Sequence, residues 1–156
     1  NPKKFERKMQ IIKEIPALET FSVRQPVLRP GKSIESCHFE GDNLESTKHF
    51  GLFSNEKLAG IASLFEDSTP LLKEKSQFQL RGMAVLPEFQ KQGLGEALVK
   101  HAENDALERC GKIMWFNARE IAVAFYKKLG YEIIGDSFNI ADIGKHYVMY
   151  KKLDAA

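Results

Sequence analysis

Residues 83–98 read MAVLPEFQKQGLGEAL, and this stretch contains the change of pattern that decides the fold. An apolar run ends at a proline, a polar segment with two glycines follows, and apolar residues recur at helical spacing from Leu94. Glycine lets the backbone approach a ligand closely, and the start of a helix presents unpaired N–H groups and the positive end of the helix dipole. Gly93 and Gly95, with Lys91 beside them, therefore predict an anion-binding turn suited to a pyrophosphate.

Two well-known phosphate-binding fingerprints do not fit this turn. A P-loop requires Lys followed by Ser or Thr after its glycines, and no such pair follows here. A dinucleotide-binding fingerprint requires a further glycine three positions after Gly95, where the chain has Leu98. A glycine pair is also compatible with a plain turn, so the glycines by themselves leave both interpretations open.

Outward from this stretch, the apolar period indicates a series of strands and helices. It predicts strands over 9–15, 47–54, 57–65, 77–86, 112–116, 131–134 and 146–152, with a hairpin turn at Asn55-Glu56. It predicts helices over 17–28, from Leu94 to a C-cap at Gly111, and over 118–129 with a C-cap at Gly130. Because strands alternate with helices in the second half, we expect a mixed sheet covered by helices, an α/β sandwich.

Composition sets limits on the class of protein. The 156 residues, 43% of them hydrophobic, predict a single domain over 1–156. The net charge of +2 gives no footprint for nucleic acid or anionic lipid, so we expect neither partner. Cys37 and Cys110 have no Cys-x-x-Cys spacing, which favours a reduced compartment. Residues 1–13 have no apolar signal core, and no segment approaches the roughly 20 apolar residues of a membrane span, so we expect a cytoplasmic protein.

The glycine turn belongs to a longer motif, and a second motif follows it. The first is Gln90-x-x-Gly93-x-Gly95 after a strand that ends Ala84-Val85-x-Pro87, and the second runs from Asn117-Ala118-Arg119 to AFYKKLGY at 124–131. Together they resemble the GNAT acyltransferase superfamily, whose pyrophosphate loop has the pattern Arg/Gln-x-x-Gly-x-Gly/Ala. The similarity extends from Phe78 to about Leu153. It implies the GNAT fold, an α/β fold with a mixed, mostly antiparallel central sheet of about seven strands, splayed in the middle, with helices on both faces.

The resemblance also implies a cosubstrate and a reaction. We expect acetyl-CoA as the acyl donor and a primary amine as the acceptor, with direct attack and no metal. The pantetheine arm would be held by main-chain atoms of Met83, Ala84 and Val85. The other CoA-binding residues that the resemblance implies are Gln90, Lys91, Gln92, Gly93, Leu94, Gly95, Glu96, Asn117, Arg119 and Tyr126.

Acyl transfer to an amine requires a base for the amine, stabilisation of the oxyanion and a proton for the leaving thiolate. The resemblance implies that Tyr126 is the proton donor; a core tyrosine is the structural alternative. Many relatives have a glutamate at a position that matches Gln79, and an amide cannot replace it as a base. Relatives often have asparagine near the position of Arg119. In this chain, the arginine could instead contact a phosphate or an acidic substrate.

Histidine titrates near neutrality and is therefore the next candidate for the base. His101 is interpreted as a surface residue, and His38 lies in a polar loop without a visible partner. His49 and His146 are the candidate catalytic histidines, although an isolated histidine in a strand is more often structural. No two histidines have short ligand spacing, so no metal site is predicted.

Two segments towards the ends of the chain resemble a bacterial GNAT subgroup of mostly unassigned substrate. They are Arg24-x-x-Val27-Leu28-Arg29-Pro30 and Phe138-Asn139-Ile140-x-x-Ile143-Gly144-x-His146, the latter expected as a loop before the final strand. The resemblance implies Arg24, Arg29, His49 and His146 as acceptor-side residues. A solvated helix face is the alternative for the two arginines.

The sequence thus predicts an N-acetyltransferase that uses acetyl-CoA and an amine acceptor. The departures at Gln79 and Arg119 leave open a catalytically silent CoA-binding sensor or interaction module. A nucleotide-binding protein of another fold is disfavoured by the failed fingerprints. A monomer and a homodimer are both compatible with the pattern, since an edge strand can pair with a second copy or stay covered.

Overall fold

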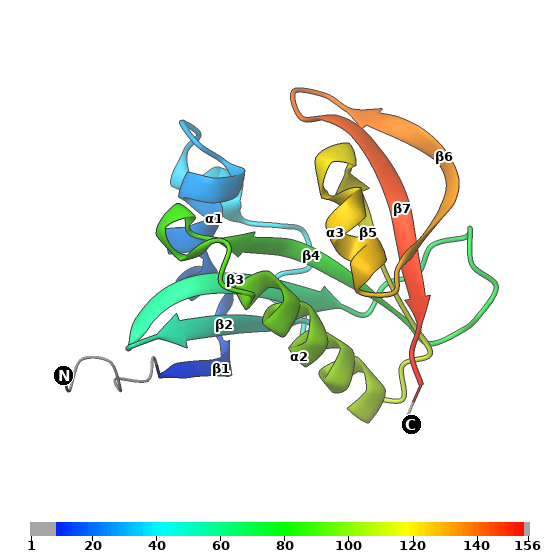
Figure 1. Cartoon of the computed structure of the whole chain (residues 1–156), viewed down its shortest axis with the longest axis horizontal. Helices are drawn as coiled ribbons and strands as arrows, with labels where there is room; N and C mark the ends of the chain where they lie inside the picture. The colour runs from blue at the N-terminus through cyan, green and yellow to red at the C-terminus, as the bar shows by residue number, and fades with distance from the viewer. Residues whose placement is uncertain (1–8, 155–156) are drawn as a thin grey trace. The chain divides into compact units, whose positions relative to one another are not determined.

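The computed structural model describes residues 9–154, so residues 1–8 of the segment without an apolar signal core lie outside the described part. The chain forms two compact units, the first made of residues up to 63 with 82–101, and the second of 64–81 with residues from 102 onward. Seven strands form one sheet in the order β1-β2-β3-β4-β5-β7-β6 (Figure 1). The strands are β1 (Gln10–Ile15), β2 (Lys48–Ser54), β3 (Lys57–Phe65), β4 (Gln77–Val85), β5 (Ile113–Arg119), β6 (Glu132–Ile140) and β7 (Gly144–Lys152). The helices are α1 (Phe21–Leu28), α2 (Leu94–Glu108) and α3 (Val123–Lys128), with short 3-10 turns η2 (Ala17–Thr20), η3 (Ile34–Cys37), η4 (Pro87–Phe89) and η5 (Glu120–Ala122).

The first unit contains the predicted hairpin. β1 runs antiparallel to β2, with Ile15 opposite His49. Asn55 and Glu56 connect β2 to β3 with φ angles of 48° and 72°, the left-handed pair that a two-residue type I′ turn requires. The predicted strands β2 and β3 and the turn between them are therefore confirmed.

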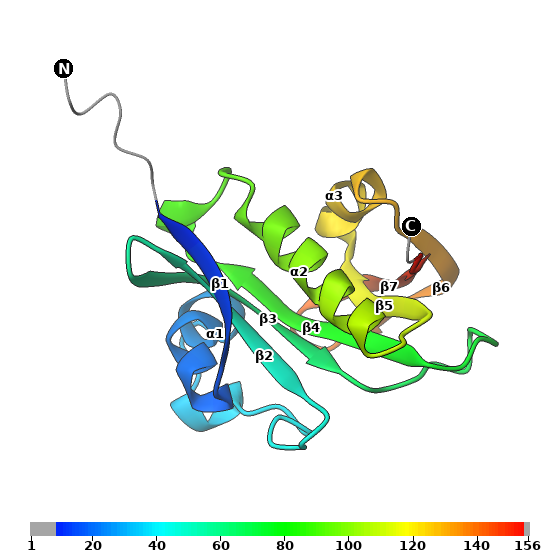
Figure 2. The same cartoon turned by 90° about the horizontal axis from the view of Figure 1, so that it is seen from below.

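Helices pack on both sides of the strands of the first unit. On one side, α1 contributes Val23 to a buried cluster with Ile15, Ile61 and Ala84. On the other side, a Cβ placed on Gly60 would lie 3.0 Å from Leu98 of α2. Figure 2 shows α1 and the beginning of α2 on opposite sides of these strands. The predicted apolar row of α2 is buried, and all four members (Leu94, Leu98, Ala102 and Ala106) are at most 2% exposed.

The second unit is built around β5 and β7. β4 pairs in parallel with β5 through three residue pairs, Gln77–Gln79 with Ile113–Trp115. β5 is antiparallel to β7 along its whole length, and β6 is antiparallel to β7 with a register shift between Ile134 and Phe138. The sheet is therefore mixed and mostly antiparallel, as predicted.

The predicted boundary between β5 and the following helix is wrong. Residues 117–119 continue β5, because β7 provides ladder partners as far as Arg119. Ala118 is buried in that strand, opposite Tyr147, although its spacing to later residues is helical. The helix is correspondingly shorter, η5 followed by α3. The same pairing extends β6 to Ile140, so residues 138–140, expected in a loop, belong to a strand.

The end of α2 also differs from the prediction. The N–H of Cys110 donates to the Leu107 oxygen and that of Gly111 to the Ala106 oxygen, at 3.0 and 2.7 Å. This is a Schellman motif in which Cys110, with φ 63°, takes the left-handed position expected for Gly111. Glycine is needed at 111 for space, since a Cβ there would lie 2.8 Å from the Ala106 oxygen and from the Phe78 ring.

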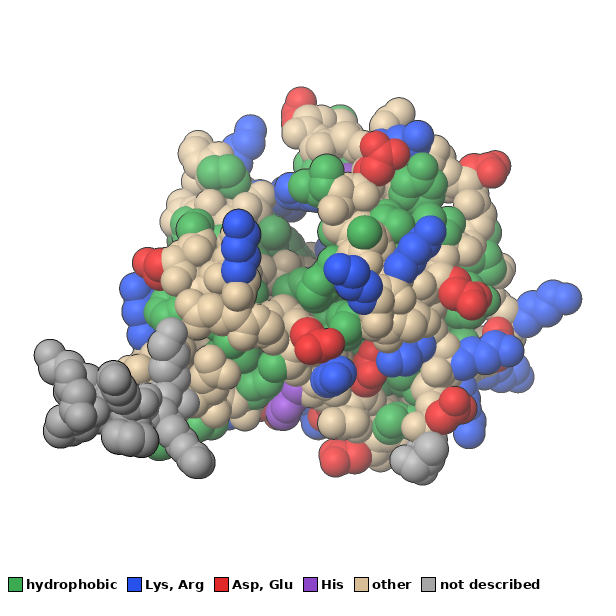
Figure 3. Space-filling view, in the orientation of Figure 1, with side chains coloured by type: hydrophobic (Ala, Val, Ile, Leu, Met, Phe, Trp, Pro, Cys, Tyr) green, Lys and Arg blue, Asp and Glu red, His purple; other side chains and the backbone are tan. Residues whose placement is uncertain are grey.

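Charged side chains of both signs are interspersed on the face drawn in Figure 3, over the residues that the structure describes. Within residues 9–154, no helix combines the length and the apolar character that a membrane span requires.

Candidate functional site

The turn before α2 has the backbone conformation that an anion site needs. Lys91 and Gly93 are left-handed, with φ angles of 62° and 80°. The first helical hydrogen bond joins the Ala97 N–H to the Gly93 oxygen at 3.1 Å, so the N–H groups of the first turn point out of the helix without helical acceptors. A Cβ on Gly93 would meet nothing within 4 Å, so conformation rather than crowding favours glycine. The side chain of Gln90 donates to the Val85 oxygen at 2.9 Å and ties the turn to the end of β4.

The strand that leads to this turn contains an irregular residue that the sequence analysis missed. Gly82, in the middle of β4, has φ 63°, and a Cβ there would lie 2.9 Å from the ring of Phe39. A left-handed glycine inside a strand interrupts the regular ladder. A glycine within an otherwise apolar strand pattern was the available signal. Met83–Val85, predicted to bind pantetheine through main-chain atoms, directly follow this irregularity.

Tyr126 combines a buried ring with an accessible hydroxyl. It is 8% exposed, and its ring packs 4.2 Å from Phe116 and 5.0 Å from Phe125, measured between centroids. Within residues 9–154, its hydroxyl has no hydrogen-bond partner, and the only fully buried side-chain polar atom without one is Nε of Arg24. The Tyr126 hydroxyl must therefore contact solvent. Burial raises the pKa of Tyr126 to about 12, so the phenol keeps its proton at neutral pH.

The neighbouring Tyr131 shows the opposite arrangement. Its hydroxyl donates to Glu103 at 2.6 Å, and Glu103 also binds Lys151 at 3.2 Å. Burial, together with the charge of Glu103, raises the pKa of Tyr131. This hydroxyl is held within the protein, whereas that of Tyr126 is available to a ligand.

The ends of β5 and β7 bring together three polar residues from two separate sequence motifs. Arg119 lies opposite His146 in the ladder, and Asn117 lies opposite Val148. Opposed residues point to the same face of a sheet and successive residues to opposite faces. Asn117, Arg119 and His146 therefore share one face, and Phe116, which contacts Tyr126, points to the other.

His146 is oriented by its own strand. Its Nδ1 lies 2.8 Å from the Gly144 oxygen, and its ring stacks on Phe138 with centroids 5.8 Å apart. A carbonyl can only accept, so Nδ1 carries the hydrogen and the neutral ring has its lone pair on Nε2. Nε2 has no hydrogen-bond partner within residues 9–154, and it is not fully buried. It therefore reaches solvent, although His146 as a whole is only 4% exposed.

Gln79 points to the same face as Asn117 and Arg119. It lies opposite Trp115 in the parallel ladder and is 7% exposed. Its amide has no basic lone pair comparable with that of a carboxylate, so this position provides no carboxylate that could act as the general base.

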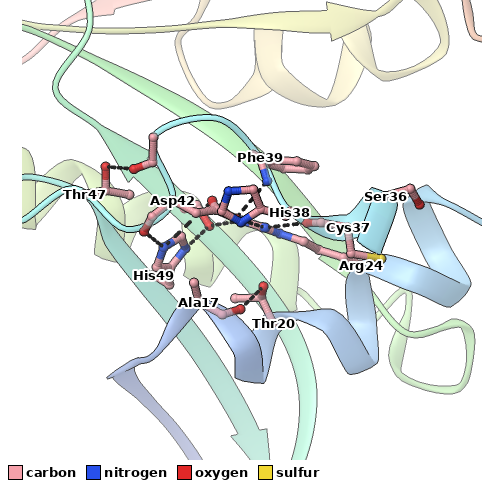
Figure 4. Close-up of polar contacts among 12 residues, drawn as sticks. Ala17, Thr20, Arg24, Ser36, Cys37, His38, Phe39, Asp42, Thr47 and His49 are labelled. Atoms are coloured by element: carbon pink, nitrogen blue, oxygen red, sulfur yellow. Dashed lines mark hydrogen bonds and ion pairs between the residues drawn. The ribbon is translucent and has the colours of Figure 1, made fainter. Parts of the chain in front are cut away.

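Arg24 is completely buried, so the alternative of a solvated helix face is wrong for this residue. Its guanidinium donates to both carboxylate oxygens of Asp42, at 2.6 and 3.1 Å, to the Cys37 oxygen at 2.8 Å and to Ser63 Oγ at 3.0 Å (Figure 4). The ring of Phe39 covers the guanidinium at 3.9 Å. Burial alone would raise the pKa of Asp42, but the hydrogen bonds from Arg24 and Phe39 and the nearby positive charge hold that pKa below its ordinary value. Arg24 therefore fixes the loop after α1 and is enclosed with its partners in the interior.

His49 belongs to the same buried network. Its Nε2 lies 2.8 Å from the Asp42 main-chain oxygen, and its Nδ1 lies 2.7 Å from Ser63 Oγ. The hydroxyl of Ser63 therefore donates to Nδ1, and Nε2–H donates to the carbonyl. Burial lowers the pKa of His49, partly offset by Asp42. Since both nitrogens are engaged in the interior, we do not assign the catalytic role predicted for His49.

The other predicted or considered residues have local contacts. Arg29 is half-buried, with Nε 3.4 Å from the Ser36 oxygen. His38, expected without a partner, lies 3.6 Å from Asp42 with its side chain 52% exposed. His101 packs edge-on against Phe50 at 4.8 Å. Among the described residues, no group of three or more His, Cys, Asp or Glu side chains is arranged to hold a metal ion.

Comparison with known proteins gives consistent matches. The profile of the acetyltransferase (GNAT) family matches residues 14–131. The chain is 42% identical over 142 residues to the uncharacterized N-acetyltransferase YitI of Bacillus subtilis (strain 168), covering 91% of this chain and 95% of that protein. It is 31% identical over 112 residues to the ribosomal protein bS18-alanine N-acetyltransferase of Escherichia coli (strain K12), covering 70% of this chain and 66% of that protein.

Solved structures agree on the fold. The crystal structure of the ribosomal-protein-S18-alanine N-acetyltransferase from Escherichia coli superposes with a TM-score of 0.74 at 23% identity, covering 95% of this chain and 96% of that chain. An aminoglycoside 6'-N-acetyltransferase complexed with coenzyme A superposes with a TM-score of 0.74 at 16% identity, covering 94% and 98%.

Proposed function

Because the chain belongs to the GNAT acetyltransferase family, we propose that it transfers an acetyl group from acetyl-CoA to a primary amine of a small molecule or a protein. Acetyl-CoA supplies the acetyl group as an activated thioester. The observation that carries the proposal is the Tyr126 hydroxyl, which keeps its proton and is accessible, as the proton donor implied by the family resemblance must be. Structural similarity to an acetyltransferase complexed with coenzyme A supports the choice of donor.

The turn before α2 fits the diphosphate of this cosubstrate. The outward N–H groups of Gly93–Glu96 and the left-handed Lys91 would bind the phosphate oxygens, and Gln92 would belong to the same cradle. The open space at Gly93 would let the ligand approach the main chain. Main-chain groups of Met83–Val85 would bind the pantetheine arm, as the family resemblance implies.

His146 is our proposed base for the amine. Its Nε2 has a free lone pair and reaches solvent, whereas both nitrogens of His49 are engaged and Gln79 cannot accept a proton usefully. The amine would give its proton to Nε2 and attack the thioester carbonyl. The C–N bond then forms, the C–S bond breaks, and Tyr126 gives its proton to the thiolate. Solvent returns His146 and Tyr126 to their starting states.

The experiment is release of free CoA thiol from acetyl-CoA across a panel of primary amines. We expect turnover with at least one amine, and Tyr126→Phe is expected to lower kcat by about 10²-fold or more while leaving the affinity for acetyl-CoA nearly unchanged. Tyr131→Phe is the matched control: it removes a neighbouring hydroxyl that is held by Glu103, so kcat should persist.

Calorimetry with acetyl-CoA separates the two main candidates. Binding without turnover on any amine would favour the catalytically silent CoA-binding module, which the amide at Gln79 motivates. Absence of binding would refute the proposal altogether.

A further inference from the structure

We propose that the acceptor amine carries a carboxylate or another anionic group close to the reacting nitrogen, and that Arg119 binds this group beside His146. The inference rests on the proposed acetyltransferase function and names the chemical class of its acceptor. It starts from the register of β5 and β7, which places Arg119 and His146 directly opposite each other in the ladder.

Arg119 is a cation without a compensating acid. Its side chain is exposed, and it forms no ion pair or hydrogen bond with any residue between 9 and 154. A planar guanidinium can bind a carboxylate through two parallel hydrogen bonds, which makes it a specific recognition group.

No acid between residues 9 and 154, including Asp136 of β6, forms an ion pair with Arg119. Glu120 is paired with Lys145 at 3.5 Å and receives the Tyr147 hydroxyl at 3.5 Å, and both of these β7 residues point away from the face of His146. Glu132 shares the face of His146 but lies opposite Tyr150, whose hydroxyl it accepts at 3.3 Å. Tyr150 lies four positions along β7 from His146, a distance of about 13 Å. A cationic acceptor would therefore be repelled at Arg119, and an anionic one attracted.

The remaining neighbours suit an amine that bears an acid. Cβ atoms of directly opposed residues lie about 5 Å apart, so the side chains of Arg119 and His146 leave the sheet from neighbouring positions on one face. Phe138 stacks on the imidazole and provides an apolar side. The ladder between β4 and β5 ends at Trp115, so residues 117–119 of β5 have no ladder partner on β4.

The test compares two kinds of matched peptide acceptors. In the first pair, the same short peptide has either a free C-terminal carboxylate or a C-terminal amide. In the second pair, the residue beside the reacting amine is either Glu or Gln. We expect the wild-type enzyme to prefer the acidic member of each pair by about tenfold or more in kcat/KM. Arg119→Gln should remove this preference through the KM for the acceptor and leave the KM for acetyl-CoA unchanged. Because Arg119 is exposed, the variant is expected to keep the wild-type melting temperature.

Lys145→Gln is the matched control, because it removes an equal charge from the adjacent position, whose side chain points to the other face and is paired with Glu120. It should keep the preference for acidic acceptors. Equal rates on acidic and neutral acceptors would overturn the inference, as would an Arg119→Gln variant whose KM rises for acetyl-CoA instead, which would assign Arg119 to a CoA phosphate. Absence of acetylation of every amine would instead refute the proposed function.

Discussion

Replacing Asp42 by asparagine keeps the size of the side chain and removes the charge that balances Arg24. Both side chains are completely buried, and Arg24 binds both carboxylate oxygens of Asp42. An amide has a single acceptor oxygen, so the guanidinium would remain in the interior without a counter-ion. Breaking a buried ion pair on one side costs about 3–5 kcal/mol of folding free energy.

This loss is large for a domain whose total stability is about 5–15 kcal/mol. For a chain of this size, each kcal/mol corresponds to roughly 2–4 °C, so the melting temperature should fall by about 6–20 °C. The measurement is urea unfolding followed by circular dichroism, with thermal melting as a second readout. Arg24→Met combined with Asp42→Leu should lose less than Asp42→Asn alone, because no unpaired charge is left behind.

Glu88→Gln is the control, since the pair between Glu88 and Lys57 spans 3.5 Å with both side chains more than half exposed. It should change the unfolding free energy by about 1 kcal/mol or less. A loss below about 1 kcal/mol for Asp42→Asn, with an unchanged m-value, would refute the reasoning, because the guanidinium would then not depend on this carboxylate.

Two further predictions concern the turn before α2 and the pH dependence of folding. Gly93→Ala should raise the KM for acetyl-CoA, because a left-handed φ of 80° costs an L-residue about 1–2 kcal/mol and so disfavours the conformation of the turn. Gly31→Ala is the control: with φ 75° and equally open space, it should lose similar stability while the KM stays unchanged. Equal KM values for both variants would contradict the role of the turn. The free energy of unfolding should decrease as the pH falls below about 6.5, because burial lowers the pKa of His49 in the folded state and the unfolded chain therefore binds the proton first. This one group can change the free energy of unfolding by at most about 1.4 kcal/mol per pH unit. Asp42 adds a further loss at lower pH, since its folded pKa lies below the ordinary 3.8 and its contribution disappears as the pH falls through that folded value. Urea unfolding between pH 7 and 5 should show a smaller slope for His49→Gln than for the wild type; identical slopes would mean that His49 titrates alike in both states.

Residue patterns were sufficient where structure depends on near neighbours. The hairpin at Asn55-Glu56, the apolar row of α2 and the C-cap at Gly130, whose φ is 96°, all follow from spacing and from the conformational freedom of single residues. The glycine turn before α2 was predicted for the same reason. Spacing failed at Ala118, where a helical period competes with a strand partner that lies far along the chain.

The sequence by itself determined the order of strands and helices, the glycine turn before α2 and, through its motifs, the family. Only the tertiary structure decided that Arg24 and His49 are enclosed with Asp42, and that Arg119 stands opposite His146. Arg24 meets partners 18 and 39 residues away, and such contacts are set by how the chain packs rather than by local propensity. The burial of a side chain and the identity of its partners are properties of the packed interior, which no short stretch of sequence contains.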